Sequence, residues 1–86
     1  MILIFHKDFS KRYAKLQQGE KQKTDARIRL FEGNPFHPIL YNHALGGIYQ
    51  GCRSVNITGN FRAIYEEIDP NTIHFIALGT HPELYD

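Results

Sequence analysis

Hydrophobic positions along this chain change their spacing part-way, and the change predicts which segments are helices and which are strands. An apolar run at residues 1–5 predicts a first strand. Residues 9–18 show helical spacing, in which apolar positions recur after three or four residues. That stripe consists of Phe9, Tyr13 and Leu16. Asp8 is the expected N-cap of this helix, because its carboxylate accepts hydrogen bonds from the first free amide groups.

A second amphipathic helix is predicted over residues 21–32. Its row of inward-facing positions consists of Thr24, Ile28 and Phe31. Gly19 separates the two helical segments. Gly33 is a natural stop, because glycine readily adopts the left-handed conformation that ends many helices. Two short helices joined near a glycine predict a helical hairpin.

The chain after the helices divides into an irregular segment and a series of strands. Residues 33–50 contain two prolines and the pair Gly46-Gly47, which predicts a connection without regular structure. From Gly51 onward apolar residues alternate with polar ones, as in strands with one buried face. The predicted strands are Arg53–Ile57, Phe61–Glu67 and Thr72–Leu78. Short turn-forming loops separate these strands, so we expect an antiparallel meander.

These elements predict an α+β fold in a single domain that spans residues 1–86. The expected sheet is small and antiparallel, with about four strands, and the N-terminal helical hairpin packs on one of its faces. The first strand must join this sheet, and we expect it beside the last strand. The second face stays open, and polar chemistry is expected there.

Composition indicates a folded, soluble protein in a reducing compartment. Hydrophobic residues make up 42% of the chain and charged residues 22%. No apolar run approaches the ~20 residues of a membrane span, so we expect no membrane association and a cytoplasmic location. The single cysteine, Cys52, excludes an internal disulfide and a cysteine-based zinc site. The five histidines lack a metal-binding spacing, so we expect no metal and no cofactor.

Charge is distributed unevenly, although the net charge is only +1. Residues 1–42 contain eight Lys or Arg and four acidic residues, whereas residues 43–86 contain two arginines and five acidic residues. A basic front half suggests an anionic partner. Ordinary solvated helix faces explain the same charges, and the sequence leaves both interpretations open.

Arg53 and Arg62 are the two arginines of the back half, and each lies in a predicted strand among apolar neighbours. A guanidinium binds phosphate oxygens through two parallel hydrogen bonds, so two arginines on adjacent strands would form a phosphate clamp. Pairing with the carboxylate of Glu66 or Glu67 across the sheet is the alternative.

Two histidines and two aromatic residues are further candidates for chemistry on RNA. His81 follows the last predicted strand and His43 lies in the irregular connection, so they suit the roles of general acid and base. The alternative is that both are solvated loop residues. Phe61 and Tyr85 are candidates for stacking on bases, although the strand position of Phe61 also fits the core.

Three motifs resemble those of the RelE/ParE toxin superfamily and, within it, the YafQ-like toxins. They are Leu45-Gly46-Gly47 followed by Gly51-Cys52-Arg53, the strand Asn60-Phe61-Arg62-Ala63-Ile64-Tyr65, and the ending Gly79-Thr80-His81-Pro82-Glu83-Leu84-Tyr85. The last motif is the most specific. The resemblance covers most of the chain. It implies a RelE/ParE-like fold, a neutralising antitoxin as partner, and action on mRNA at the ribosome.

The resemblance also implies a reaction and the residues that perform it. In ribosome-dependent mRNA cleavage by such toxins, a 2′-hydroxyl attacks the adjacent phosphate without a metal, and translation is inhibited. By resemblance, His43 and His81 transfer protons and Arg62 stabilises the phosphate. The implied substrate contacts are Arg53, Asn56, Asn60, Phe61 and Tyr85.

The sequence departs from the YafQ-like pattern at three positions. Asn56 stands in place of a histidine, Asn60 in place of an aspartate, and Ala77 in place of an active-site arginine. These departures favour a weak nuclease, or a non-catalytic binding protein of the same fold such as one that binds DNA gyrase. Arg53 and Asn56 have opposite parity on one strand, so they share a face only if a bulge or the strand end intervenes. Regular alternation would turn Ala77 towards the helices.

Overall fold

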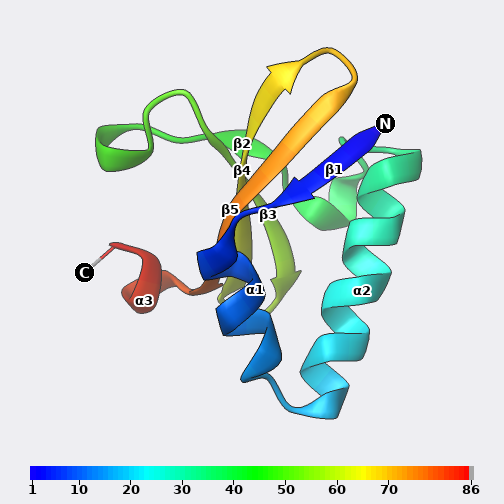
Figure 1. Cartoon of the computed structure of the whole chain (residues 1–86), viewed down its shortest axis with the longest axis vertical. Coiled ribbons are helices and arrows are strands. Elements are labelled where there is room, and N and C mark those ends of the chain that lie inside the picture. The colour runs from blue at the N-terminus through cyan, green and yellow to red at the C-terminus, as the bar shows by residue number, and fades with distance from the viewer. Residues whose placement is uncertain (86) are drawn as a thin grey trace.

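The computed structural model describes residues 1–85, which form a five-stranded sheet with helices packed on it. The strands are β1 (Ile2–Phe5), β2 (His43–Ala44), β3 (Arg53–Thr58), β4 (Phe61–Asp69) and β5 (Thr72–Thr80). The helices are α1 (Lys7–Ala14), α2 (Gln18–Gly33) and α3 (His81–Tyr85), and the 3-10 turns are η1 (Pro38–Leu40) and η2 (Gly47–Tyr49). Figure 1 shows that α1 and α2 form a hairpin beside the sheet, as the sequence predicts.

The sheet order is β1-β5-β4-β3-β2, in which β1 runs parallel to β5 and all other neighbours are antiparallel. This arrangement confirms the predicted α+β fold and the position of the first strand beside the last. The sequence predicts about four strands, and the structure has five. The additional strand is β2, in which His43 pairs with Ser54 and Ala44 pairs with Arg53. A two-residue strand carries no recognisable period, so the sequence pattern does not reveal it.

Both helices begin earlier than the hydrophobic pattern predicts. The expected cap Asp8 lies inside α1, and the true cap is His6, whose Nδ1 accepts a hydrogen bond from the Asp8 backbone N–H at 3.0 Å. Histidine is not a common capping residue, which explains the wrong prediction. α2 starts before Gly19, because the Gln17 N–H donates to Glu20 Oε1 at 3.0 Å and completes the first turn. Gly19 therefore does not separate the helices.

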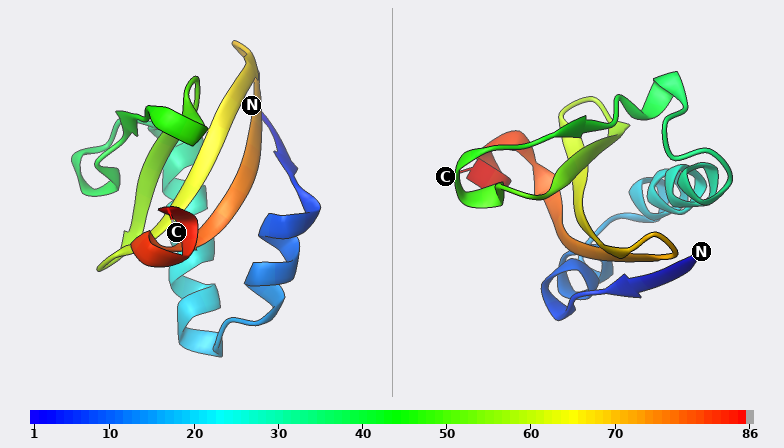
Figure 2. Two further views of the ribbon diagram at one scale, coloured as in Figure 1. Left: turned by 90° about the vertical axis from the view of Figure 1, so that its left-hand side faces the viewer. Right: turned by 90° about the horizontal axis from the view of Figure 1, so that it is seen from above.

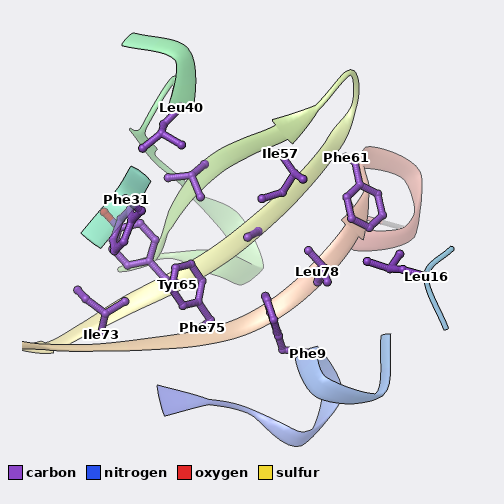
Figure 3. Close-up of a cluster of buried hydrophobic side chains, with 12 residues drawn as sticks. Phe9, Leu16, Phe31, Leu40, Ile57, Phe61, Tyr65, Ile73, Phe75 and Leu78 are labelled. Carbon is purple, nitrogen blue, oxygen red and sulfur yellow. The ribbon is translucent and has the colours of Figure 1, made fainter. Parts of the chain in front are cut away.

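The main core lies between the sheet and the α1–α2 hairpin, and aromatic rings form its centre (Figure 3). The ring centroid of Phe75 in β5 lies 5.4 Å from that of Phe31 in α2 and 5.7 Å from that of Phe9 in α1. Tyr65 of β4 packs edge-on against Phe31, with 4.9 Å between centroids. The apolar stripes of both helices therefore face the sheet, and this burial holds the hairpin on one side.

The other face of the sheet carries a smaller apolar cluster. Its buried members are Cys52, Ile64 and Leu84. The pairing of β4 with β5 shifts register at Ile76, which forms a β-bulge. Because of the bulge, Ile76 and Ala77 both pack against this cluster, although regular alternation would send them to opposite faces. Ala77 therefore faces away from α1 and α2, which corrects the expectation from alternation.

Candidate active site

The face of the sheet away from α1 and α2 is the candidate active site. In the right panel of Figure 2, α3 and η2 lie on one side of the sheet and α2 lies on the other. Val55 belongs to the main core, so its strand neighbours Ser54 and Asn56 face the α3 side. Cross-strand partners share a face, and these two residues pair with His43 and Arg62 respectively. All four side chains therefore lie on the face away from α1 and α2, which is called the open face below.

Arg62 presents a positive charge on this face and forms no ion pair within residues 1–85. Its Nε is buried without a hydrogen-bond partner, and so is the Oδ1 of its cross-strand neighbour Asn56. The carboxylate of Glu66, an alternative partner for Arg62, instead pairs with His74 at 3.0 Å. Buried polar groups are normally satisfied. A guanidinium that the folded chain leaves partly unsatisfied is therefore suited to an anion that binds from outside.

Arg53 lies on the opposite face and does not join Arg62. Its cross-strand partner Tyr65 belongs to the main core. The Arg53 Nε donates to Asn42 Oδ1 at 2.7 Å, and its guanidinium lies 5.3 Å from the centroid of the Phe36 ring. Asn42 also donates to the Tyr65 hydroxyl at 2.8 Å, which ties the segment before β2 to the core. The two-arginine clamp, one of the two interpretations that the sequence leaves open, is therefore wrong, because the two guanidinium groups lie on opposite sides of the sheet.

His43 is held in one tautomer by the residue two positions before it. Its Nδ1 lies 2.8 Å from the carbonyl oxygen of Tyr41. A carbonyl oxygen only accepts, so Nδ1 carries the proton and Nε2 of the neutral ring is free to accept one. The imidazole is half-buried at the end of the open face and lies 4.8 Å from the Tyr41 ring, centroid to centroid. This geometry suits a general base.

His81 is the first residue of α3, and its imidazole is exposed. Its backbone N–H donates to the carbonyl oxygen of Asn60 at 3.1 Å, so the β3–β4 hairpin holds the start of α3. The imidazole packs on the ring of Tyr85 at 4.5 Å, and Tyr85 contacts the Tyr49 ring at 5.4 Å, both measured between centroids. Residues 1–85 contain no ring contact or hydrogen bond that joins His81 to His43.

The carboxylate of Glu83 joins α3 to α1 and to the end of β5. Glu83 Oε1 accepts hydrogen bonds from the Arg12 guanidinium at 3.0 Å and from the Thr80 backbone N–H at 2.8 Å. These hydrogen bonds, that from Arg12 above all, lower the pKa of Glu83 to about 2. A Cβ at Gly79 would lie 3.3 Å from the same oxygen, so a glycine allows this close approach. Sequence reasoning missed the cap, although Thr80 and Glu83 have the spacing of a capping box.

Phe61 belongs to the core rather than to the open face. It is 6% exposed, and the guanidinium of Arg12 lies 5.3 Å from its ring centroid. Phe61 is therefore a core residue, which its strand position had suggested as the alternative to base stacking. Its ring has no free face on which a base could stack. Its neighbour Asn60 is exposed in the hairpin, where its carbonyl oxygen supports α3.

Other chemistry-bearing side chains of the described chain are dispersed. Among residues 1–85, no three His, Cys, Asp or Glu side chains lie close enough to hold a metal ion. Cys52 is buried, and burial raises the pKa of its thiol, which makes it a poor nucleophile. No helix in the part of the chain that the structure describes is long and apolar enough to cross a membrane.

Comparison with known proteins assigns the chain to a family. The family model described as the bacterial toxin of type II toxin–antitoxin systems, YafQ, matches residues 2–86. This chain belongs to the YafQ toxin family. Membership confirms the resemblance drawn from the three sequence motifs. No curated protein sequence matches the chain significantly.

Solved toxin structures share the fold of this YafQ-family member. YafQ from E. coli strain BL21(DE3) is 22% identical, with a TM-score of 0.80 over 98% of this chain and 97% of that one. A YoeB/ParE toxin from Agrobacterium tumefaciens is 21% identical, with a TM-score of 0.78 over 94% and 99% of the two chains. A chain of the E. coli DinJ–YafQ toxin–antitoxin complex is 22% identical, with a TM-score of 0.77 over 98% and 96%.

The open face of this YafQ-family toxin gathers some of the residues that the resemblance implied. Those on the face or at its α3 end are His43, Asn56, Arg62, His81 and Tyr85. Arg53 and Phe61 lie on the helix side, and Asn60 contributes its backbone to the support of α3. Ala77 ends a cross-strand row that consists of His43, Ser54, Ile64 and Ala77 and contains no Lys or Arg. Arg62 lies in the neighbouring row, between Asn56 and Gly79.

The Arg12–Glu83 pair makes stability depend on pH in a defined window. The folded pKa of about 2 lies below the ordinary value of 4.5. The pair therefore stabilises the fold above pH 4.5 and loses this contribution as the pH falls towards 2. We expect Glu83→Gln to unfold at a lower urea concentration than the unaltered protein at neutral pH, with a difference that shrinks as acid protonates Glu83. A difference that stays constant from neutral pH to strong acid would contradict this role.

Proposed function

We propose that this protein is a metal-independent endoribonuclease that cleaves mRNA on the ribosome, inhibits translation and is neutralised by a cognate antitoxin. The observation that carries the proposal is Arg62, whose guanidinium has no ion-pair partner within residues 1–85 and lies beside the unpartnered Oδ1 of Asn56. A cation of this kind, on a face of the sheet with a histidine at either end, suits a phosphodiester. Membership in the YafQ toxin family supports the same activity.

The reaction needs a base, an acid and a group that stabilises negative charge. His43 takes the proton of a ribose 2′-hydroxyl through Nε2, the nitrogen that its hydrogen bond to Tyr41 leaves free. The 2′-oxygen attacks the adjacent phosphorus, and Arg62 stabilises the charge that builds on the phosphate oxygens. His81 gives a proton to the departing 5′-oxygen. The products are a 2′,3′-cyclic phosphate and a free 5′-hydroxyl.

Further residues of the face position the RNA in this proposal. Asn56 lies across from Arg62 and offers its amide to a phosphate or sugar oxygen. Tyr85 presents a half-buried ring beside His81, on which a base stacks. Asn60 reaches the RNA from the exposed hairpin. We leave Phe61 out of the substrate contacts, because its ring is buried.

The antitoxin has a candidate docking surface between β1, α1 and α2. A groove of about 460 Å³ lies there, lined mainly by apolar side chains. Its lining consists of Leu3, Phe5, Phe9, Ser10, Tyr13 and Ile28, together with the charged residues Asp25, Arg29 and Glu32. The E. coli relative forms the DinJ–YafQ toxin–antitoxin complex. We therefore propose that an amphipathic antitoxin segment lays its apolar side in this groove, while its acidic residues meet the basic residues of α1 and α2.

A non-catalytic role is the second candidate function. Ala77 and Asn56 replace the arginine and the histidine that the resemblance implies, and both lie on the open face. A protein that binds its target through this fold, such as one that binds DNA gyrase, does not need those two side chains. Analysis of mRNA ends distinguishes this role from the nuclease.

Loss of the Arg62 guanidinium tests the nuclease directly. Induction of the unaltered protein in cells, followed by primer extension on abundant mRNAs, should reveal new 5′ ends. We expect Arg62→Gln to reduce cleavage by about a hundredfold, because the developing charge loses its cation. Arg62→Lys should give an intermediate rate, because it keeps the charge but not the planar fork. Induction without any new 5′ ends would favour the binding-only role.

Replacement of either catalytic histidine tests the proton transfers. We expect His43→Ala and His81→Ala each to lower cleavage on programmed ribosomes by about a hundredfold or more. Thermal stability and antitoxin binding should change little, since neither imidazole belongs to the main core. His37→Asn is the matched control, because it keeps a side-chain acceptor for the Ile39 N–H and should cleave normally. Full activity in both alanine variants would move the chemistry elsewhere.

The position of Ala77 suggests a variant that gains activity. Its side chain lies on the open face, at the end of the cross-strand row of His43, Ser54, Ile64 and Ala77. We expect Ala77→Arg to raise the cleavage rate by about tenfold or more, because a fixed second cation lowers the barrier. Cleavage on programmed ribosomes and melting temperature should be measured together. A stable Ala77→Arg protein with no gain in rate, alongside an unaltered protein that does not cut, would contradict the nuclease.

Filling the groove tests the antitoxin surface. Ser10 lines the groove and is exposed, so Ser10→Trp should occupy the space that the antitoxin segment needs. We expect this variant to stop co-purifying with the cognate antitoxin at moderate salt, whereas Ser10→Ala should co-purify normally. Cleavage by Ser10→Trp should persist, since the groove and the open face are on different sides of the sheet. Normal antitoxin capture by Ser10→Trp would place the interface elsewhere.

A further inference from the structure

Tyr41 has an unusual backbone conformation immediately before the candidate base. Within residues 1–85 it is the one residue other than glycine with a positive φ, which is 45°. The left-handed region is unfavourable for a bulky side chain, and glycine or asparagine occupies it at lower cost. The turn follows η1, where the Tyr41 N–H donates to the Pro38 carbonyl oxygen at 3.1 Å. The fold therefore keeps a tyrosine at a position where its backbone is strained.

The strained turn joins Tyr41 to the imidazole of His43 in two ways. The Tyr41 carbonyl oxygen accepts the Nδ1 proton at 2.8 Å, and the two rings lie 4.8 Å apart at an interplanar angle of 46°. The first contact involves only the backbone of Tyr41. The second involves its side chain, so the two contributions can be separated by substitution.

The Tyr41 ring is far more exposed than the tyrosine rings that stabilise the fold. Tyr41 is 64% exposed, and its hydroxyl has no hydrogen bond within the described residues. By contrast, the hydroxyls of three other tyrosines are bonded inside the molecule. Those tyrosines are Tyr13, which donates to Asp25, Tyr49, which donates to the Leu84 carbonyl, and Tyr65, which accepts from Asn42. Packing within the fold therefore does not account for the Tyr41 side chain.

We infer that the ring of Tyr41 is a stacking platform for one unpaired base of the RNA substrate, at the His43 end of the open face. Bases stack on exposed aromatic rings in single-stranded RNA recognition, and the stacked base need not be of one kind. A base held there keeps its ribose near His43 Nε2. The ring already lies against the His43 imidazole, so part of its conformational freedom is lost before the base binds. This inference deepens the proposed nuclease function and rests on it.

Tyr41→Gly removes the ring while the backbone keeps its conformation, because glycine adopts a φ of this sign without strain. The probe is a short single-stranded RNA with 2′-O-methyl groups, which prevent cleavage, and one 2-aminopurine whose fluorescence falls on stacking. We expect Tyr41→Gly to weaken binding by about tenfold and to lose the fluorescence change. Tyr41→Phe should bind within about twofold of the unaltered protein, because it keeps the ring. Tyr41→Asn, which also tolerates the left-handed region, replaces Tyr41→Gly if that variant does not fold.

Phe36→Ala is the matched control, because Phe36 is 65% exposed in the same segment but lies against Arg53 on the other side of the sheet. It should bind the probe normally. On programmed ribosomes, Tyr41→Gly should raise KM with little change in kcat, because the carbonyl that orients His43 is retained.

Two results would overturn the inference. The first is equal RNA binding by Tyr41→Gly and the unaltered protein; if antitoxin capture is lost at the same time, the ring belongs to a protein interface. The second is an equal loss of RNA binding in Tyr41→Phe and Tyr41→Gly, which would assign the effect to the hydroxyl. If the unaltered protein binds the probe through Tyr41 but cuts no mRNA on ribosomes, the nuclease proposal fails and the stacking platform stands.

Discussion

The packing of four aromatic rings around Phe75 is the interaction on which the rest of this structure depends. The rings of Phe5, Phe9, Phe31 and Tyr65 all lie within 5.7 Å of it, centroid to centroid, and they come from β1, α1, α2 and β4. Phe75 itself is fully buried. Phe9, Phe31 and Tyr65 are buried with it, whereas Phe5 is 41% exposed. Burial of the four buried rings decides which side of each strand faces the helices. Because side chains alternate along a strand, it also decides which residues must face the other way.

The open face is therefore a consequence of the core. Arg62 lies between Phe61 and Ala63, which are both buried on the helix side, so its guanidinium has to emerge opposite them. The same rule separates Arg53 from Asn56. No bulge lies between these two residues, and they occupy opposite faces, as their parity requires. A one-residue shift of β4 would turn its charges into the aromatic core, so the register that stabilises the protein is also the register that exposes Arg62.

The fold was largely predictable because it depends on period, and the exceptions have local causes. Apolar spacing located α1, α2 and the three strands of the meander, and the YafQ-like motifs placed them in one fold. Three local features cannot be recognised from apolar spacing. They are the helix cap at His6, the two-residue strand β2 and the bulge at Ile76. The bulge matters most for the site, because it moves Ala77 to the open face without changing the hydrophobic pattern of β5.

The candidate site was less predictable than the fold, because contacts between distant segments decide the environment of its side chains. Motif spacing indicated His43, Arg62 and His81, and strand parity indicated the side of the sheet. Spacing could not show that Asn42 holds Arg53 on the helix side, or that Arg12 covers the ring of Phe61. The positive φ of Tyr41 is equally hidden, since tyrosine is not a residue that predicts a left-handed turn.

The hydrogen bond between Arg12 and Glu83 joins residues 71 positions apart, and β1 pairs with β5 over a similar separation. Contacts of such long range form late, because the chain must first close a large loop. The open face depends on segments from both ends of the described chain: α1 contributes an ion pair to the support of α3, and β1 covers the edge of β5. We therefore expect the face that carries Arg62 to be completed only when these distant segments have come together.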